Sequence, residues 1–259
     1  MPNTSDKRNT PLKPLKWYKK LAGKKERLES GLFLIEGERA VNQVIKNQPD
    51  RVTEIVTSEK SSPFANDFPV RFLDEHRFHS ICLTKTPQGT AAVIRIPLET
   101  YSDNLPETIG TKVLLLEDIQ DPGNLGTLIR TASAFDFSGI ILTEKCADPF
   151  SPKCVQSTAG SILSLWIRRT GKYHELASTL KKRGYLFAAA DLDGEADLSF
   201  LGSHEKILLA LGNEASGLSK TLLNASDRRI IIPISRKKAE SLNVATCGAI
   251  LMYLVSQKP

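Results

Sequence analysis

Apolar runs alternate with helix-forming segments throughout the second half of the chain. Five of these runs are typical of strands: "KVLLLE", "GIILTE", "YLFAAA", "KILLAL" and "RRIIIPI". Helices are predicted between and after them, at residues 125–135, 153–161, 173–183, 218–223 and 241–256. Because the runs are apolar at nearly every position, both faces of their sheet should be covered. The pattern therefore predicts an α/β fold with a mostly parallel sheet and helices on both sides.

A smaller α/β unit is predicted before a division near residue 105. Strands are expected in "GLFLIE", "RVTEIVTS" and "AAVIRIP", and a strand followed by a helix in "VRFLDEHRFHSICLT". A further helix follows "GLFLIE", with four apolar residues on one face: Ala40, Val41, Val44 and Ile45. Residues 98–111 are polar, carry Pro106 and Gly110, and are typical of a linker. We therefore expect one domain at 1–105 and a second at 106–259.

Positive charge is concentrated at the start of the chain. The net charge is +6 over 259 residues. The first thirty residues alone carry nine basic and three acidic side chains, a difference of +6: Lys7, Arg8, Lys13, Lys16, Lys19, Lys20, Lys24, Lys25 and Arg27 against Asp6, Glu26 and Glu29. Trp17 and Tyr18 lie within this basic arm, which suits the phosphate backbone and stacked bases of a nucleic acid. A solvated surface helix is the alternative interpretation.

Several classes of protein are disfavoured by composition. No apolar run approaches the ~18 residues that a membrane-spanning helix needs, and the first twenty residues lack the apolar core of a secretion signal. The four cysteines form no C-x-x-C pair, which indicates reduced thiols in a cytoplasmic protein: Cys82, Cys146, Cys154 and Cys247. His76 and His79 favour an exposed helix face over a metal site, and no metal is predicted.

The first of three unusual loops is "EDIQDPGNLGTLIRTASAFD". Pro122 and Gly123 force a turn, and Asn124 is predicted to cap the helix that follows. Arg130 lies further along that helix, either as a surface residue or reaching back to the strand ends. Ligands bind at the carboxyl ends of strands in sheets of this kind.

The other two loops are "LALGNEASGLSK" and "IIIPISRKKAESLNVATCGAILMYLV". In the first, Gly212 permits a close backbone approach to a ligand, and Asn213 and Glu214 form a polar turn. It matches neither a Walker loop nor G-x-G-x-x-G, so a plain nucleotide-binding sheet has no phosphate loop here. In the second, Pro233 ends a strand and Ser241 is predicted to cap the C-terminal helix.

These loops, in this order, resemble those of the SpoU/TrmH family of RNA ribose 2′-O-methyltransferases, in the SPOUT superfamily. The resemblance rests on "DPGNLGTLIRTASAFD", "LGNEASGLS" and "IP…ESLNVA", with "PKCVQSTAGSI" in support, and covers about residues 111–256. "FLIEGERAV" and "TKTPQGTAAV" are similar, less specifically, to the family's ribosomal-protein-like RNA-binding domain. The resemblance implies a C-terminal trefoil knot, a homodimer, and S-adenosyl-L-methionine held bent as cofactor.

The resemblance also implies which residues act. Three positions should touch the cofactor, mainly through their backbone: Gly212, Ile232 and Leu242. Five polar positions should surround the reacting ribose: Asn124, Arg130, Glu214, Ser241 and Asn243. Arg130, from the same subunit or from the other subunit of the dimer, would act as general base or would stabilise the developing alkoxide. A neutral arginine costs on the order of 8 kcal/mol at neutral pH, so stabilisation is physically easier, and both roles stay open.

Two departures from the family pattern bear on the cofactor. Ala215 stands where relatives usually have glycine, and a positive φ there would be strained. The loop "SRKKAE" lacks the usual glycine, and its Arg236, Lys237 and Lys238 are candidates for RNA contact.

The predicted function is methyl transfer from S-adenosylmethionine to a ribose 2′-hydroxyl in a cytoplasmic enzyme. Ribosomal RNA is favoured over tRNA because of the separate front domain. The alternative is a knotted RNA-binding protein with weak or no catalysis that acts in ribosome assembly.

Overall fold

The computed structural model describes residues 13–84, 86–235, 237–238 and 240–257. The chain forms two compact units. The first takes the chain up to Pro97 together with Phe150–Leu163, and the second takes Leu98–Pro149 and the chain from Ser164 onward. Phe150–Leu163 therefore packs with the first unit although the second surrounds it in sequence. The domain assignment 1–105 and 106–259 stays a prediction, because compact units and evolutionary domains need not coincide.

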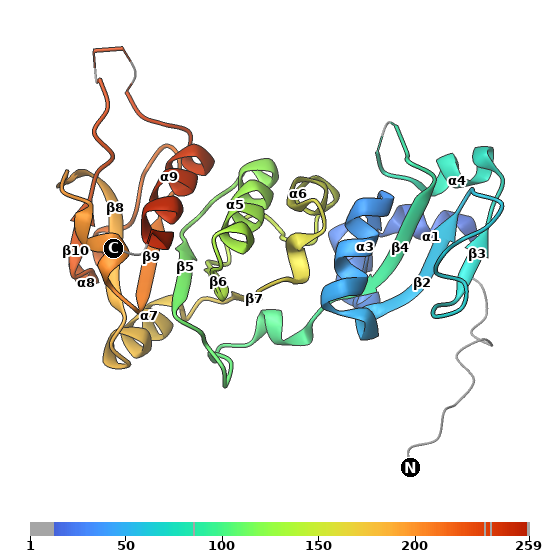
Figure 1. The fold of residues 1–259 in the computed structure, drawn as a ribbon, viewed down its shortest axis with the longest axis horizontal. Coiled ribbons are helices and arrows are strands. Elements are labelled where there is room, and N and C mark those ends of the chain that lie inside the picture. Colours follow the sequence, from blue (N-terminus) through green and yellow to red (C-terminus); the bar gives the residue numbers. More distant parts are fainter. Residues whose placement is uncertain (1–12, 85, 236, 239, 258–259) are drawn as a thin grey trace. The chain divides into compact units, whose positions relative to one another are not determined.

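A six-stranded parallel sheet forms the centre of the second unit (Figure 1). Its strands are β5 (Lys112–Leu116), β6 (Gly139–Leu142), β7 (Trp166–Arg169), β8 (Leu186–Glu195), β9 (Ile207–Leu211) and β10 (Arg228–Ile230). The order is β10-β8-β9-β5-β6-β7, and every neighbouring pair is parallel. The predicted mostly parallel sheet is confirmed. The trefoil knot that the family resemblance implies stays a prediction.

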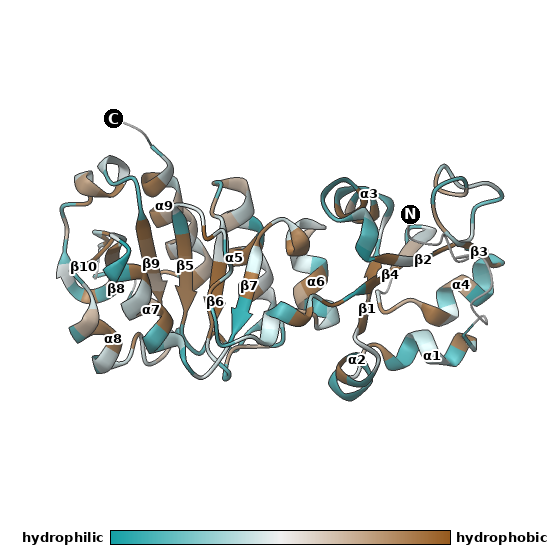
Figure 2. Cartoon of the chain, turned by 90° about the horizontal axis from the view of Figure 1, so that it is seen from below, coloured by the Kyte–Doolittle hydropathy of each residue, from teal (hydrophilic) through white to brown (hydrophobic). Residues whose placement is uncertain are grey.

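Helices cover both faces of this sheet, as predicted. They are α5 (Pro122–Ala134), α7 (Tyr173–Lys182), α8 (Lys220–Ala225) and α9 (Val244–Ser256). Alternate residues of a strand point to opposite faces. Val113 and Leu115 pack in one core cluster with residues of α7 and α8. On the other face α9 lies close to α5 and β9, since a Cβ added at Gly248 would come within 2.8 Å of Leu128 and Leu211 side-chain atoms. The hydropathy colouring shows the apolar central strands (Figure 2).

Strand β7 is an element that the sequence pattern did not predict. Its four residues, "WIRR", are two apolar residues followed by two arginines at the sheet edge, so they lack a long apolar run. The predicted linker lies along it: the indole Nε1 of Trp166 donates to the Ile109 carbonyl at 2.9 Å, and Arg168 Nε donates to the Asn104 carbonyl at 2.7 Å. Residues 104–109 are therefore held against the sheet.

The first unit contains a mixed four-stranded sheet of order β1-β4-β2-β3. The strands are β1 (Leu32–Glu36), β2 (Val52–Thr57), β3 (Val70–Phe72) and β4 (Thr90–Arg95), and the helices are α1 (Leu15–Lys20), α2 (Lys24–Ser30), α3 (Glu38–Asn47), α4 (Glu75–Ile81) and α6 (Pro152–Thr158). Strand β4 runs antiparallel to β1 and β2. Val41 and Val44 of α3 are buried, as the helical periodicity predicts. This smaller α/β unit confirms the predicted front domain as a fold.

The basic arm forms α1 and α2, and one of its aromatic residues is not available to RNA. Tyr18 is fully buried, and its hydroxyl donates to Glu54 at 2.7 Å while accepting from Arg71 at 3.0 Å. The prediction that Tyr18 stacks on bases is therefore wrong, whereas Trp17 stays half-buried. Burial and the Glu54 carboxylate raise the pKa of Tyr18 well above its usual value.

The lysines of the arm are placed differently from Arg27. Arg27 is buried, and its guanidinium donates to two backbone carbonyls, those of Leu21 and Ala22. Lys7 and Arg8 lie outside the described residues. The exposed cations of the arm are Lys13, Lys16, Lys19, Lys20, Lys24 and Lys25. No helix among the described residues is long and apolar enough to cross a membrane.

Candidate active site

The carboxyl ends of β5 and β9 lie side by side, because the two strands pair in parallel with Leu116 opposite Leu211. The chain continues from β5 to β6 on one side, while β9, β8 and β10 lie on the other. Strand β5 is thus where the strand order reverses. Loops that leave neighbouring strands at such a point form the usual ligand crevice of an open parallel sheet.

The loop after β9 is closed on itself and tied to the loop after β5. Asn213 and Gly217 exchange two backbone hydrogen bonds at 3.1 and 2.9 Å. The Asn213 side chain donates to the Asp118 carbonyl at 2.9 Å and accepts from the backbone N–H of Ala215. The left-handed backbone falls at Gly217, with φ of 66°. Ala215 is not among the positive-φ residues, so the strain expected there is absent.

Gly212 is required by this loop closure. A Cβ at Gly212 would lie 2.2 Å from the carbonyl carbon of Gly217, far inside any real contact. The sequence predicted a close backbone approach by a ligand at Gly212. In the structure it is Gly217, at the far end of the same loop, that makes this close approach. A side chain at Gly212 would open the turn that carries Glu214.

Helix α5 begins with a cap different from the predicted one. Asp121 is the N-cap: its carboxylate accepts from the Asn124 N–H at 2.9 Å, and Pro122 follows at the first helical position. The prediction that Asn124 is the cap is wrong, because an aspartate directly before proline fits the cap geometry better. The consequence is that the Asn124 side chain is available for other contacts.

Asn124 connects the other two loops. Its Nδ2 donates to Glu214 Oε1 at 2.7 Å, and its Oδ1 accepts from Asn243 Nδ2 at 3.2 Å. Asn243 is itself the N-cap of α9, since its Oδ1 accepts from the N–H groups of Ala245 and Thr246. The predicted cap, Ser241, lies before the helix and is wrong. These two side-chain bonds span 90 and 119 residues of sequence and join three loops through Asn124.

Two of the predicted ribose-site residues stand apart from this chain of bonds. Arg130 and Ser241 are exposed, and neither side chain has a hydrogen-bond or ion-pair partner among the described residues. Arg130 lies six positions after Asn124 on α5, so the two side chains project ~120° apart around the helix axis. Within one chain Arg130 and Asn124 therefore face different directions.

The three predicted cofactor positions share one property. The backbone groups of Gly212, Ile232 and Leu242 make no hydrogen bond to any other described residue. All three residues are only half-buried, and they lie just after β9, just after β10 and just before α9. Partly buried backbone groups normally find partners in protein, water or ligand. These positions therefore offer free donors and acceptors at the carboxyl edge of the sheet.

Glu117 is a supporting residue that the sequence pattern did not single out. Its carboxylate is buried and accepts from the Tyr173 hydroxyl at 3.1 Å and from the Ser219 N–H at 2.6 Å. Burial, followed by the Glu117 charge, raises the pKa of Tyr173 to about 12, so the phenol stays protonated as donor. Glu117 thus fixes the far end of the loop that carries Glu214. The sequence feature that could have pointed to Glu117 is its place, as a charged residue directly after the apolar run at 113–116.

The basic loop after β10 is irregular. The strand ends at Ile230, two residues earlier than the sequence pattern indicates, and a turn follows in which the Lys238 N–H donates to the Ser235 carbonyl at 2.8 Å. Lys237 and Lys238 are exposed, while Arg236 lies outside the described residues. No cluster of three metal-ligating side chains occurs within the described ranges.

Comparison with known proteins identifies the class. The family described as SpoU rRNA methylase matches residues 111–253, and the family described as MRM3-like substrate binding domain matches residues 13–92. The first match spans more than half of the chain. The protein belongs to the SpoU rRNA methylase family.

Particular relatives resemble the chain over nearly its full length. The 23S rRNA (guanosine(2553)-2'-O)-methyltransferase RlmP of Bacillus subtilis is 35% identical over 92% of this chain and 94% of the relative. A TrmH-family structure from Porphyromonas gingivalis has a TM-score of 0.79 at 30% identity, covering 95% of this chain and 98% of its own. A structure of an AdoMet-bound rRNA methyltransferase from Sinorhizobium meliloti has a TM-score of 0.79 at 26% identity, covering 93% of both chains.

Proposed function

We propose that the protein transfers a methyl group from S-adenosylmethionine to a ribose 2′-hydroxyl of ribosomal RNA. The observation that carries this proposal is the bonded series Asn243–Asn124–Glu214, which gathers three separated loops at the switch point of a parallel sheet. Family membership and the rRNA methyltransferases among its relatives support the reaction and the substrate class.

Asn124 and Glu214 position the ribose. An amide whose oxygen and nitrogen are both engaged cannot rotate freely, so Asn124 presents a fixed edge to the substrate. Glu214 is exposed and keeps a second carboxylate oxygen for a ribose hydroxyl. Holding the reacting oxygen in one orientation is a large part of what such a site contributes, since the reaction requires an in-line approach.

Arg130 stabilises the charge that develops on the 2′-oxygen. Its side chain faces away from Asn124 of the same chain, which supports a homodimer in which the arginine of one subunit serves the site of the other. A charged guanidinium directed at a developing alkoxide is a strong electrostatic contribution in a site that excludes water.

The residues present fit S-adenosylmethionine, which supplies an electrophilic methyl group when bound. Gly212, Ile232 and Leu242 would hold it through the backbone groups that lack partners among the described residues. Ile232 and Leu242 also offer half-buried apolar surface for an adenine ring. Ser241 lies directly before Leu242 and is placed to contact the substrate or the cofactor.

The front unit binds the RNA. Six exposed lysines of the arm offer contacts to phosphates, and the matching family is described as substrate binding. We place the protein in the cytoplasm, where ribosomal RNA and reduced cysteines are found; none of the four cysteines forms a disulfide.

The test is transfer of tritium from labelled S-adenosylmethionine to unmodified 23S ribosomal RNA, followed by nuclease mapping of the labelled nucleotide. We expect incorporation at one ribose. Incorporation into the base, or into no RNA at all, contradicts the proposal.

The alternative is an RNA-binding protein in which the glycine-free loop at 234–240 has abolished cofactor binding. Titration calorimetry with S-adenosylmethionine distinguishes the two. Micromolar binding supports the enzyme, whereas undetectable binding together with tight RNA binding supports the assembly protein.

A further inference from the structure

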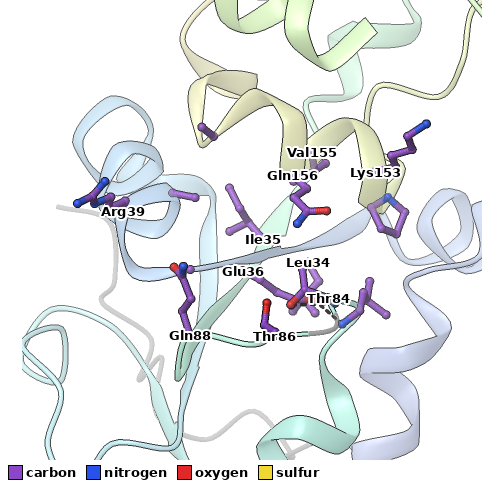
Figure 3. Close-up of a pocket in the computed structure, with 15 residues that line it drawn as sticks. Leu34, Ile35, Glu36, Arg39, Thr84, Thr86, Gln88, Lys153, Val155 and Gln156 are labelled. Atoms are coloured by element: carbon purple, nitrogen blue, oxygen red, sulfur yellow. Dashed lines mark hydrogen bonds between the residues drawn. The ribbon is translucent and has the colours of Figure 1, made fainter. Parts of the chain in front are cut away.

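A cavity of about 490 Å³ lies within the first unit, away from the residues assigned above (Figure 3). Its walls are the end of β1 with the start of α3, the loop residues Leu83, Thr84, Thr86 and Gln88, and helix α6. The volume falls in the range of small-ligand sites. Neither the proposed methyl-transfer site nor the lysines of the arm contribute to it.

The wall formed by α6 is fixed in place. Phe150, just before α6, packs on Phe33 of β1 with ring centroids 5.1 Å apart. After α6, Gly160 lies so close to α3 that an added Cβ would be 2.8 Å from the Cα of Ala40. Both ends of the α6 segment are therefore anchored to the first unit, and the cavity is preformed.

Glu36 places a carboxylate in the floor. Its oxygens accept from the Leu83 N–H at 2.6 Å, from the Thr84 N–H at 3.2 Å, and from the Thr84 hydroxyl. A carboxylate has about four acceptor sites, so about one stays open to a ligand. The negative charge of Glu36 disfavours a phosphate at the floor of the cavity and favours an N–H donor there.

Three uncharged polar side chains line the same space. Gln156 points from α6 into the cavity, with Thr86 on the opposite side and Gln88 nearby (Figure 3). None of these side chains hydrogen-bonds to another described residue, and all three are exposed. Primary amides and hydroxyls match the donor and acceptor pattern of base edges.

Apolar surface and two cations complete the site. Leu34, Ile35 and Val155, all nearly buried, line the cavity with apolar atoms. Arg39 from α3 and Lys153 from α6 are exposed and lie on opposite sides of the cavity in Figure 3. A nucleotide within an RNA strand has a phosphate on each side. Two cations on opposite sides of the cavity therefore suit one nucleotide of an RNA strand.

We propose that this cavity receives one unstacked nucleotide of the RNA substrate, its base inserted with an exocyclic amino group toward Glu36 and its flanking phosphates at Arg39 and Lys153. The proposal rests on the proposed function only in taking RNA as the substrate. Adenine, cytosine and guanine carry such an amino group, whereas uracil does not. The site thus reads the RNA at a position other than the methylated ribose.

Fluorescence anisotropy with labelled five-nucleotide RNAs tests the base preference on the full-length protein. We expect oligoadenylate and oligocytidylate to bind about tenfold more tightly than oligouridylate. Glu36→Gln, which replaces the carboxylate by a neutral amide of the same shape, should lose most of this preference. The double variant Gln156→Ala/Thr86→Val, which removes two neutral polar contacts, should weaken binding of all three RNAs. Gln48→Ala, an exposed glutamine of the same unit outside the cavity, should keep it. Equal binding of the three RNAs by the wild type, a preference that survives in Glu36→Gln, or unchanged binding by the double variant overturns the proposal.

Phosphate contacts are tested separately from base contacts. Arg39→Gln should weaken the binding of all three RNAs alike and should reduce the slope of log affinity against log salt concentration by about one. Lys46→Gln, further along α3, should change neither the affinity nor the slope. Adenosine monophosphate that binds as tightly as oligoadenylate would indicate a free-nucleotide site and overturn the assignment to RNA.

The result is independent of catalysis. Base preference without methyl transfer to 23S rRNA would contradict the proposed function and leave this inference standing. Methyl transfer with no base preference would contradict this inference and leave the proposed function standing.

Discussion

The two sheets of this protein build their candidate ligand sites by different means. In the six-stranded sheet all strands are parallel, so the loops after β5, β9 and β10 leave from one edge and meet there. In the four-stranded sheet β4 runs antiparallel to β1, so the end of β1 lies beside the loop that enters β4. That edge offers only two walls, and α6 supplies the third. A parallel sheet thus builds a site from its own loops, whereas the mixed sheet here uses a segment from elsewhere in the chain.

The largest expected effect concerns the parallel sheet. Arg130→Ala should lower kcat for methyl transfer by about 100-fold or more, because the developing oxyanion loses its charged donor. The affinity for S-adenosylmethionine, measured by calorimetry, should stay within about twofold. Arg183→Ala is the matched control, since Arg183 is exposed at the end of α7 and far along the chain from these loops. Full activity in the Arg130→Ala enzyme would remove the arginine from the mechanism.

Mixed dimers sharpen that experiment. If the arginine acts across subunits, heterodimers of Arg130→Ala and Asn124→Ala chains recover one intact site. We expect activity well above that of either parent homodimer. Activity no higher than that of the parents would place the arginine in its own chain's site.

The second prediction concerns the segment that the mixed sheet uses. Gly160→Ala should destabilise the first unit by about 2–4 kcal/mol, because the new methyl group meets the α3 backbone in addition to the strained φ of 92°. Gly184→Ala has a similar φ of 84° but open space around the Cβ, so it should cost only about 1 kcal/mol. Equal losses in urea unfolding would show that α6 is not held tightly against α3.

Sequence patterns predicted the parallel sheet better than the details of its site. Strands with continuous apolar runs were found, whereas the short β7, in which two of four residues are arginines, was not. The loop residues that meet, Asn124, Glu214 and Asn243, were predicted by resemblance, but both helix caps were assigned to the wrong residue. Several polar residues fit a cap in sequence, and only backbone geometry selects one.

The cavity of the mixed sheet could not be predicted at all. Its walls come from residues 34–40, 83–88 and 152–159, and no local pattern records that these segments meet. Gly160 was the one sequence signal, and its reason is the close approach of α3. Burial of Tyr18 was likewise invisible, because an aromatic residue among lysines is equally compatible with RNA stacking and with a core.

The third prediction measures how strongly two loops of the parallel sheet are coupled. Asn124→Ala and Glu214→Ala should each reduce kcat/KM, and their effects should be non-additive by about 1–2 kcal/mol because a 2.7 Å charge-assisted bond joins them. The double-mutant cycle uses kcat/KM with a fixed RNA fragment. Strict additivity would mean that the two residues act separately.

The smallest expected effect compares the two units through their thiols. Burial, with Glu36 nearby, raises the pKa of Cys82 to about 12, and burial raises that of Cys247 to about 11. At pH 8 both are protonated, so alkylation by iodoacetamide should be slow and should rise about tenfold per pH unit. Cys247 in the second unit should react about tenfold faster than Cys82. Equal, fast reaction in the folded protein, as in urea, would contradict the burial of Cys82 and the partial burial of Cys247.

The central claim is that the loops after β9 and β10 and the segment before α9 form one cofactor site. It is tested most directly by titrating isotope-labelled protein with S-adenosylmethionine and following the backbone amides of Gly212, Ile232 and Leu242 by NMR. The account predicts that these three signals shift together with a single dissociation constant. Saturable binding that leaves all three unchanged, or that moves them with different constants, would contradict it.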